Sequence, residues 1–168
     1  MLDRLRREIL RTERVDIAPI LATLADIHET TRAPDAPRLV LEAPPAGLTV
    51  NGLEGRLVQV FRNLIGNAVS FSPKGGTIRL IGRRAGGMVE VAVEDEGPGI
   101  PEAKLEHIFE RFYSERPQGE QFGTHSGLGL SISRQIVEAL RGRIVAENRR
   151  DESGAVIGAR FVVRLPEA

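Results

Sequence analysis

Residues 88–100 read MVEVAVEDEGPGI, a stretch in which a short apolar pattern runs directly into a glycine turn. Val89, Val91 and Val93 alternate with polar or small residues, a period of two that is typical of a half-buried β-strand. Asp95 ends the pattern, and the glycines behind it let the backbone approach a ligand closely. A carboxylate in that place can accept a hydrogen bond from the ligand. Taken alone, the pattern also fits an ordinary turn that begins with aspartate.

Further upstream, apolar residues at every third or fourth position predict an amphipathic helix over residues 53–70. Asn63 and Asn67 are four positions apart, so both amides should leave the same face of this helix, away from the apolar stripe. Amide carbonyl oxygens suit Mg²⁺, which keeps several waters and shares its remaining sites with phosphates. The simpler alternative for such a pair is a solvated polar face.

The remaining elements follow from the same patterns. Helices are expected from Pro19, over 101–108 and from 127 or 128 to 140, together with strands over 38–42, 77–83, 88–95, 143–148 and 159–165. This order predicts an α/β (α+β) two-layer sandwich, in which a mixed sheet of about five strands has three helices on one face. Residues 114–126 show neither period and are expected to form a loop.

After that loop, residues 126–130 read SGLGL and open the last helix. The start of a helix presents unpaired N–H groups and the positive end of the helix dipole, which together favour an anion such as a phosphate. Glycines let phosphate oxygens reach the backbone. A plain glycine-rich loop is the alternative.

Composition limits the possible partners. The chain has 168 residues with zero formal net charge, 41% hydrophobic and 27% charged residues, and no cysteine. One domain is expected, without a membrane span and without the broad basic field that attracts nucleic acid. The missing cysteines exclude disulfides and thiolate metal sites, and they fit a cytoplasmic location.

Four segments together resemble the sensor histidine kinases. Residues 63–68 are similar to the N box of that family, 95–100 to its G1 box, 108–113 to its F box and 127–130 to its G2 box, all in family order. The resemblance runs from about Val15 to Pro166. Residues 112–117 and 131–135 look similar to the ChvG/ExoS branch of envelope-sensing kinases.

This resemblance implies a Bergerat-type fold that binds ATP and Mg²⁺. Asp95 would read the adenine amino group, Asn67 with Asn63 would hold the metal, and the phosphates would meet the G2 backbone. An ATP lid would span 100–126. The implied nucleotide-binding positions are Asp95, Gly97, Gly99, Ile100, Phe109, Phe112, Ser126, Gly127, Leu128, Gly129 and Leu130.

Two departures from the family pattern concern basic residues. Ser70 and Ser114 stand where many members carry a basic residue, and Lys74 and Arg116 are the candidates to replace them at the phosphates.

A third departure concerns the general base. Asn63 occupies the place at which related ATPases such as gyrase have a water-activating glutamate, and an amide cannot act as a general base at neutral pH. The site is therefore expected to hold ATP but to hydrolyse it poorly.

The acceptor histidine of the family lies on a separate dimerisation and histidine-phosphotransfer domain. His28 superficially resembles the acceptor motif, but it lies too close to Asn63 for the family's long helical hairpin to fit between them. We therefore expect residues 1–14 to end a dimerisation helix and residues 15–168 to form the catalytic domain, a monomer that works with that phosphotransfer domain and a response regulator. The alternatives are a degenerate nucleotide-binding module and a serine kinase of the anti-sigma-factor type.

Overall fold

Within residues 4–5, 7, 11–110 and 129–168, which are those that the computed structural model describes, five strands form one mixed sheet. Their order is β2 (Arg38–Glu42), β4 (Thr77–Ala85), β5 (Met88–Glu94), β7 (Val156–Pro166) and β6 (Arg143–Arg150). The edge strand β2 is parallel to β4, and the other neighbours are antiparallel. The predicted fold class and sheet are confirmed.

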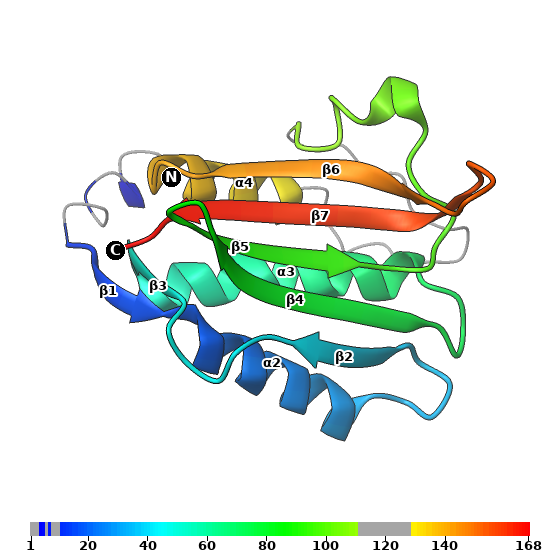
Figure 1. The fold of residues 1–168 in the computed structure, drawn as a ribbon, viewed down its shortest axis with the longest axis horizontal. Coiled ribbons are helices and arrows are strands. Elements are labelled where there is room, and N and C mark those ends of the chain that lie inside the picture. Colours follow the sequence, from blue (N-terminus) through cyan, green and yellow to red (C-terminus); the bar gives the residue numbers. More distant parts are fainter. Residues whose placement is uncertain (1–3, 6, 8–10, 111–128) are drawn as a thin grey trace.

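Three helices cover one face of this sheet. In Figure 1, α4 (Gly129–Ala139) lies behind β6, α3 (Glu54–Phe71) behind β4 and β5, and α2 (Ile17–Thr31) beside β2. The apolar stripe of α3 meets the alternate, inward-pointing residues of the strands. The fully buried side chains at this contact include Leu57, Val60, Phe61, Leu64, Ile78, Leu80, Val91 and Val163. No helix of the described residues is both long and apolar enough to span a bilayer.

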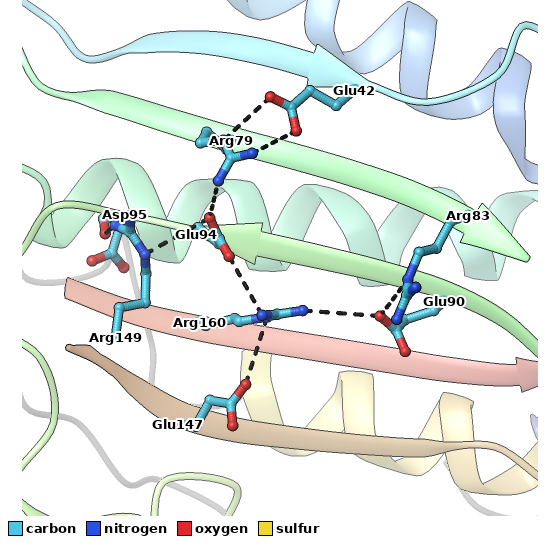
Figure 2. A network of polar contacts seen from close by, with 9 residues as sticks. All are labelled: Glu42, Arg79, Arg83, Glu90, Glu94, Asp95, Glu147, Arg149 and Arg160. Atoms are coloured by element: carbon cyan, nitrogen blue, oxygen red, sulfur yellow. Dashed lines mark hydrogen bonds and ion pairs between the residues drawn. The ribbon is translucent and has the colours of Figure 1, made fainter. Parts of the chain in front are cut away.

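The other face of the sheet is covered by its own charged side chains. Glu90 and Glu94 of β5 point to this face, yet they are only 5% and 6% exposed. Arginines of the neighbouring strands surround them, as Figure 2 shows for Arg79, Arg83 and Arg160. These long side chains shield the sheet, and the sandwich therefore needs no second helical layer.

Two short strands were not predicted from the sequence. β1 (Glu13–Asp16) pairs antiparallel with β3 (Thr49–Gly52), and the backbone of Ala168 donates to the Thr49 carbonyl. Four residues are too few to show a period. The expectation that residues 1–14 end a helix is wrong at residues 13 and 14, because Glu13 and Arg14 already belong to β1. Residues 4, 5 and 7 are helical, and Leu5 is 2% exposed within the core.

The short helix expected over residues 101–108 is also wrong. The structure has a single 3₁₀ turn at Glu102–Lys104 and then further turns, with backbone bonds that span three residues, such as His107 to Lys104. Such tight turns bring Ile108 and Phe109 into the core, where both are buried. The last helix begins at Gly129 in the described residues, and the two residues before it lie outside them.

Asp16 ties β1, α2 and the segment before β3 together. Its carboxylate caps α2 by accepting from the Ala18 N–H at 3.1 Å, and it also accepts from the N–H groups of Gly47 and Leu48, each at 2.9 Å. Burial acts to raise the pKa of Asp16, but the three backbone hydrogen bonds outweigh it and lower the pKa.

We expect Asp16→Ala to lower the free energy of unfolding by about 1–2 kcal/mol, the usual range for a lost helix cap. Because the pKa of Asp16 is lowered by folding, its contribution is present above the unfolded-state pKa and is lost as pH falls through the folded-state pKa. Urea unfolding at neutral and acid pH measures both effects. Asp26→Ala, an exposed site on the same helix, should change the stability by less than about 0.5 kcal/mol. Equal effects of the two variants would contradict this role.

Candidate functional site

Asp95 follows the last residue of β5 and is a buried carboxylate, 1% exposed. Its Oδ1 accepts from the Gly97 N–H at 2.9 Å and from the Ala159 N–H at 3.0 Å. Its own N–H donates to the Ala159 carbonyl at 3.0 Å. Among the described residues, both bonds to this carboxylate use Oδ1 and neither uses Oδ2. The fold thus fixes one oxygen, while the second can accept from a ligand.

The charge state of Asp95 reflects opposing effects. Burial raises the pKa of Asp95, whereas the hydrogen bonds from Ala159 and Gly97 and the positive charge of Arg149 act to lower it, and the net direction is upward. A buried carboxylate with a perturbed pKa at a strand end is a typical feature of a functional site.

The glycines of the turn are required by close packing. A Cβ at Gly97 would lie 2.5 Å from the carbonyl oxygen of Phe71, the last residue of α3. Gly99 has φ 79°, and a Cβ there would collide with the side chain of Val156. The sequence had suggested that these glycines leave room for a ligand; in the structure they also leave room for neighbouring parts of the protein.

Asn63 connects α3 to the start of α4. Its Nδ2 donates to the carbonyl of Gly129 and to Oγ of the buried Ser133, each at 3.2 Å. A carbonyl can only accept, so the amide nitrogen must face Gly129 and Oδ1 must face the other way. Segments that lie 66 positions apart in the sequence therefore meet here.

Asn67 lies one turn further along α3 and is 4% exposed. The alternative of a solvated polar face is therefore wrong for Asn67, and the magnesium role of the two amides stays a prediction.

The helix α3 places the candidate sites at a fixed spacing. Asn63 contacts Gly129, and Phe71 adjoins Gly97 eight residues later. At 1.5 Å per residue, these points lie about 12 Å apart along the helix axis. The glycine turn after β5 and the first turn of α4 thus lie along one helix, although they are distant in the chain.

The other predicted residues fall into three groups. Ile100 and Leu130 pack against the core, and Phe109 is buried with its ring edge-on to Phe161 at a centroid distance of 6.1 Å. Lys74 is exposed and pairs with Asp35 at 3.7 Å, and its phosphate contact stays a prediction. Five predicted residues lie outside the described residues: Phe112, Arg116, Ser126, Gly127 and Leu128.

The described histidines have local partners. His28 Nε2 donates to the Pro37 carbonyl at 2.7 Å, and His107 Nδ1 lies 2.6 Å from Glu110. His125 lies outside the described residues. In the described part of the chain, no group of three or more acidic or histidine side chains is arranged to hold a metal ion. A metal at this site would depend on amide oxygens and on the ligand itself.

Sequence reasoning missed the contribution of β6 and β7. Asn148 and Arg149 bond to the segment 95–100, and Gly158 lies against the carbonyl of Asp95. A polar residue or a glycine within a strand pattern gives no signal of its own, because only the pairing of strands shows which segment it faces.

We expect Gly158→Ala to lower the free energy of unfolding by about 1–3 kcal/mol, because its Cβ would overlap the Asp95 carbonyl, a backbone atom that cannot move away alone. Chemical denaturation measures the change. Gly55→Ala is the matched control: no atom lies within 4 Å of the added Cβ, and alanine favours the helix by up to about 1 kcal/mol. A Gly158→Ala variant as stable as the control would refute the packing argument.

The comparisons with known proteins agree with this geometry. The sensor protein ChvG of Rhizobium meliloti (strain 1021) is 44% identical over 172 residues, which cover 97% of this chain and 30% of that protein. A solved catalytic domain of the histidine kinase ThkA, in a nucleotide-free form, superposes with a TM-score of 0.78 at 27% identity and covers 93% of this chain and 95% of that one. ThkA in complex with the response regulator protein TrrA gives 0.75 at 25% identity, over 99% of this chain and 47% of that one.

The chain thus spans about a third of the ChvG protein that it matches. A family model described as histidine kinase-, DNA gyrase B- and HSP90-like ATPase matches residues 52–168, which include Asn63, Asp95 and Gly129. We conclude that the chain belongs to the histidine kinase-, DNA gyrase B- and HSP90-like ATPase family and that, within it, the chain resembles the catalytic domains of sensor histidine kinases.

Proposed function

We propose that this domain binds Mg·ATP and transfers the γ-phosphate to a histidine on a dimerisation domain outside residues 1–168. The observation that carries the proposal is the bond between Asn63 and Gly129, which brings the amides of α3 to the first turn of α4. The buried carboxylate of Asp95 lies beyond the other end of the same helix segment. A nucleotide would lie along α3, with its base at Asp95 and its phosphates towards Gly129.

Adenine recognition rests on Asp95. A carboxylate is an acceptor only, and the amino group of adenine is a donor. The Gly97 and Ala159 N–H groups orient the carboxylate through Oδ1, and Oδ2 would accept from the base. In a dry pocket, a charge-assisted bond of this kind contributes about 1.5–3 kcal/mol.

Phosphate and metal binding rests on Asn63, Asn67 and the start of α4. The first turn of a helix of 11 residues offers N–H donors and a positive dipole to phosphate oxygens. Because the amide nitrogen of Asn63 is bonded to Gly129 and Ser133, its Oδ1 is the end that would face a magnesium ion, together with Asn67. The metal would neutralise charge on the transferring phosphate.

The acceptor must supply its own base. Asn63 has no basic form at neutral pH, and its amide nitrogen is already bonded within the protein. His28 donates its Nε2 proton to a backbone carbonyl, an arrangement that serves structure and not transfer. The acceptor domain of the same kinase and a response regulator are the partners we propose, with the domain acting on the cytoplasmic side of a membrane-anchored sensor. The likenesses to ChvG and to ThkA with TrrA support these partners.

We expect Asp95→Asn to weaken ATP binding about ten- to a hundredfold, because the substitution replaces a charged acceptor by a neutral amide. Calorimetry with a non-hydrolysable ATP analogue measures the affinity. The thermal midpoint should not fall. Burial raises the pKa of Asp95, so folding stability falls as pH rises through the folded-state pKa of this group. The amide of Asn does not ionise, so the variant does not suffer this loss of stability.

The control for this variant is Asp35→Asn, which changes an exposed carboxylate that pairs with Lys74. It should bind the analogue as the unchanged protein does. If Asp95→Asn binds the ATP analogue as tightly as the control does, Asp95 does not accept a hydrogen bond from the adenine amino group.

We expect no self-phosphorylation when the chain is incubated with labelled ATP and Mg²⁺, and labelled acceptor histidine once a ChvG-type dimerisation domain is added. Chelation of Mg²⁺ or the substitution Asn67→Ala should abolish the transfer. The assay follows label on each protein after electrophoresis and tests the acid lability that is typical of phosphohistidine.

Three results would contradict the proposal in different ways. Efficient self-labelling would place the acceptor inside this chain. Acid-stable label on serine would indicate a serine kinase. Binding of the analogue without phosphate transfer to any acceptor domain would indicate that the chain is a nucleotide-binding module without kinase activity.

A further inference from the structure

The glycine turn at residues 95–100 is held at its far end by Asn148 of β6. The Ile100 N–H donates to Asn148 Oδ1 at 2.7 Å, and Asn148 Nδ2 donates to the Ile100 carbonyl at 2.7 Å. One side chain thus satisfies both backbone groups of one residue, as a neighbouring strand would. The amide orientation follows from the two partners, because the N–H can only donate and the carbonyl can only accept.

The near end of the same turn is held by the next residue of β6. Arg149 Nη1 donates to the carbonyl of Asp95, and Arg149 Nε lies 3.7 Å from Glu94. Figure 2 shows this guanidinium between Glu94 and Asp95. Gly158 makes the approach possible, since a Cβ at that position would overlap the Asp95 carbonyl and lie 3.1 Å from Arg149 Nη1.

Consecutive strand residues point to opposite faces of a sheet. Asn148 therefore bonds the turn from the helical side and Arg149 bonds it from the charged face. Arg149 is itself oriented by Glu94, which also pairs with Arg79 at 2.8 Å and Arg160 at 3.6 Å (Figure 2). Through Arg149, the ion pairs of the charged face thus extend to the backbone carbonyl of Asp95.

A turn with glycines at positions 97 and 99 has many conformations to lose when it binds a ligand. Contacts that fix it before binding lower this cost and raise the affinity. The effect is specific to the base, because only the base would meet Asp95. The Arg149 charge also acts to lower the pKa of Asp95 and so favours its ionised, accepting form.

We propose that Asn148 and Arg149 are positioning residues for adenine recognition, which hold the two ends of the segment 95–100 so that the Asp95 carboxylate is in place before the nucleotide binds. This inference rests on the proposed function. The inference gives a role to strand β6, which contacts neither the base nor the phosphates in the proposed function.

The test compares the affinities of ADP and inosine diphosphate, measured by calorimetry on the whole chain. Inosine has a carbonyl where adenine has the amino group, so the unchanged protein should prefer ADP, and Asp95→Asn should lose this preference. Asn148→Ala and Arg149→Ala should each weaken ADP binding about five- to tenfold, the equivalent of one lost hydrogen bond or more. They should weaken inosine diphosphate binding less, so that the preference falls.

Arg143→Ala is the matched control, since Arg143 is an exposed arginine at the other end of the same strand. It should leave both affinities unchanged. Asn148→Asp keeps the acceptor for the Ile100 N–H but loses the donor to the Ile100 carbonyl, and should fall between the unchanged protein and Asn148→Ala. If the thermal midpoint of Asn148→Ala shows that this variant does not fold, the comparison is made with Asn148→Asp instead.

Two results would overturn the inference while the proposed function stands. One is an unchanged ADP affinity in the Asn148 and Arg149 variants. The other is an equal loss of affinity for ADP and inosine diphosphate, which is the result expected of a general structural defect. A protein that does not prefer ADP in its unchanged form, or an Asp95→Asn variant that keeps the preference, would instead overturn the proposed function and the inference with it.

Discussion

The burial of one carboxylate constrains the rest of this site. Placing Asp95 at 1% exposure opposes its ionisation, and the surrounding structure must offset that cost. Two backbone N–H groups bond to Oδ1, one from the turn that follows and one from β7. The register of β5 with β7 therefore serves the site directly, because a shift of one residue would move the Ala159 N–H away from the carboxylate.

A second consequence of this burial is the crowding around the turn. Gly97 lies against the end of α3, and Gly158 lies against the Asp95 carbonyl. Glycine is required at both positions because two backbone segments approach so closely that a Cβ would overlap backbone atoms. The helix α3 then connects the turn to α4 through Asn63, whose amide nitrogen bonds to Gly129 and Ser133. The base, metal and phosphate positions that we propose would thereby be set along one helix and not by separate loops.

The charged face of the sheet complements this arrangement. Glu90 and Glu94 are nearly buried although they lie on the side without helices. Arginines from the neighbouring strands β4 and β7, and from β6 beyond β7, pair with them. A buried ion pair contributes little net stability, but loss of one partner leaves a charge without compensation. In this network, removal of one arginine would leave a nearly buried glutamate with less compensation. At its edge, Arg149 extends the network to the segment that carries Asp95.

The sequence by itself determined the layers and the main strands and helices, because periodic apolar patterns are local features. It also predicted which segments carry the chemistry, from glycine-flanked polar residues. Sequence reasoning did not find the pairing of β1 with β3, the burial of Asn67, or the part played by Asn148, Arg149 and Gly158. It also did not find the ion pair of Lys74 with Asp35. All of these depend on which segments meet after folding. Strand order and helix packing set those meetings, and a polar side chain within a strand has the same local pattern whether it faces solvent or the backbone of another segment.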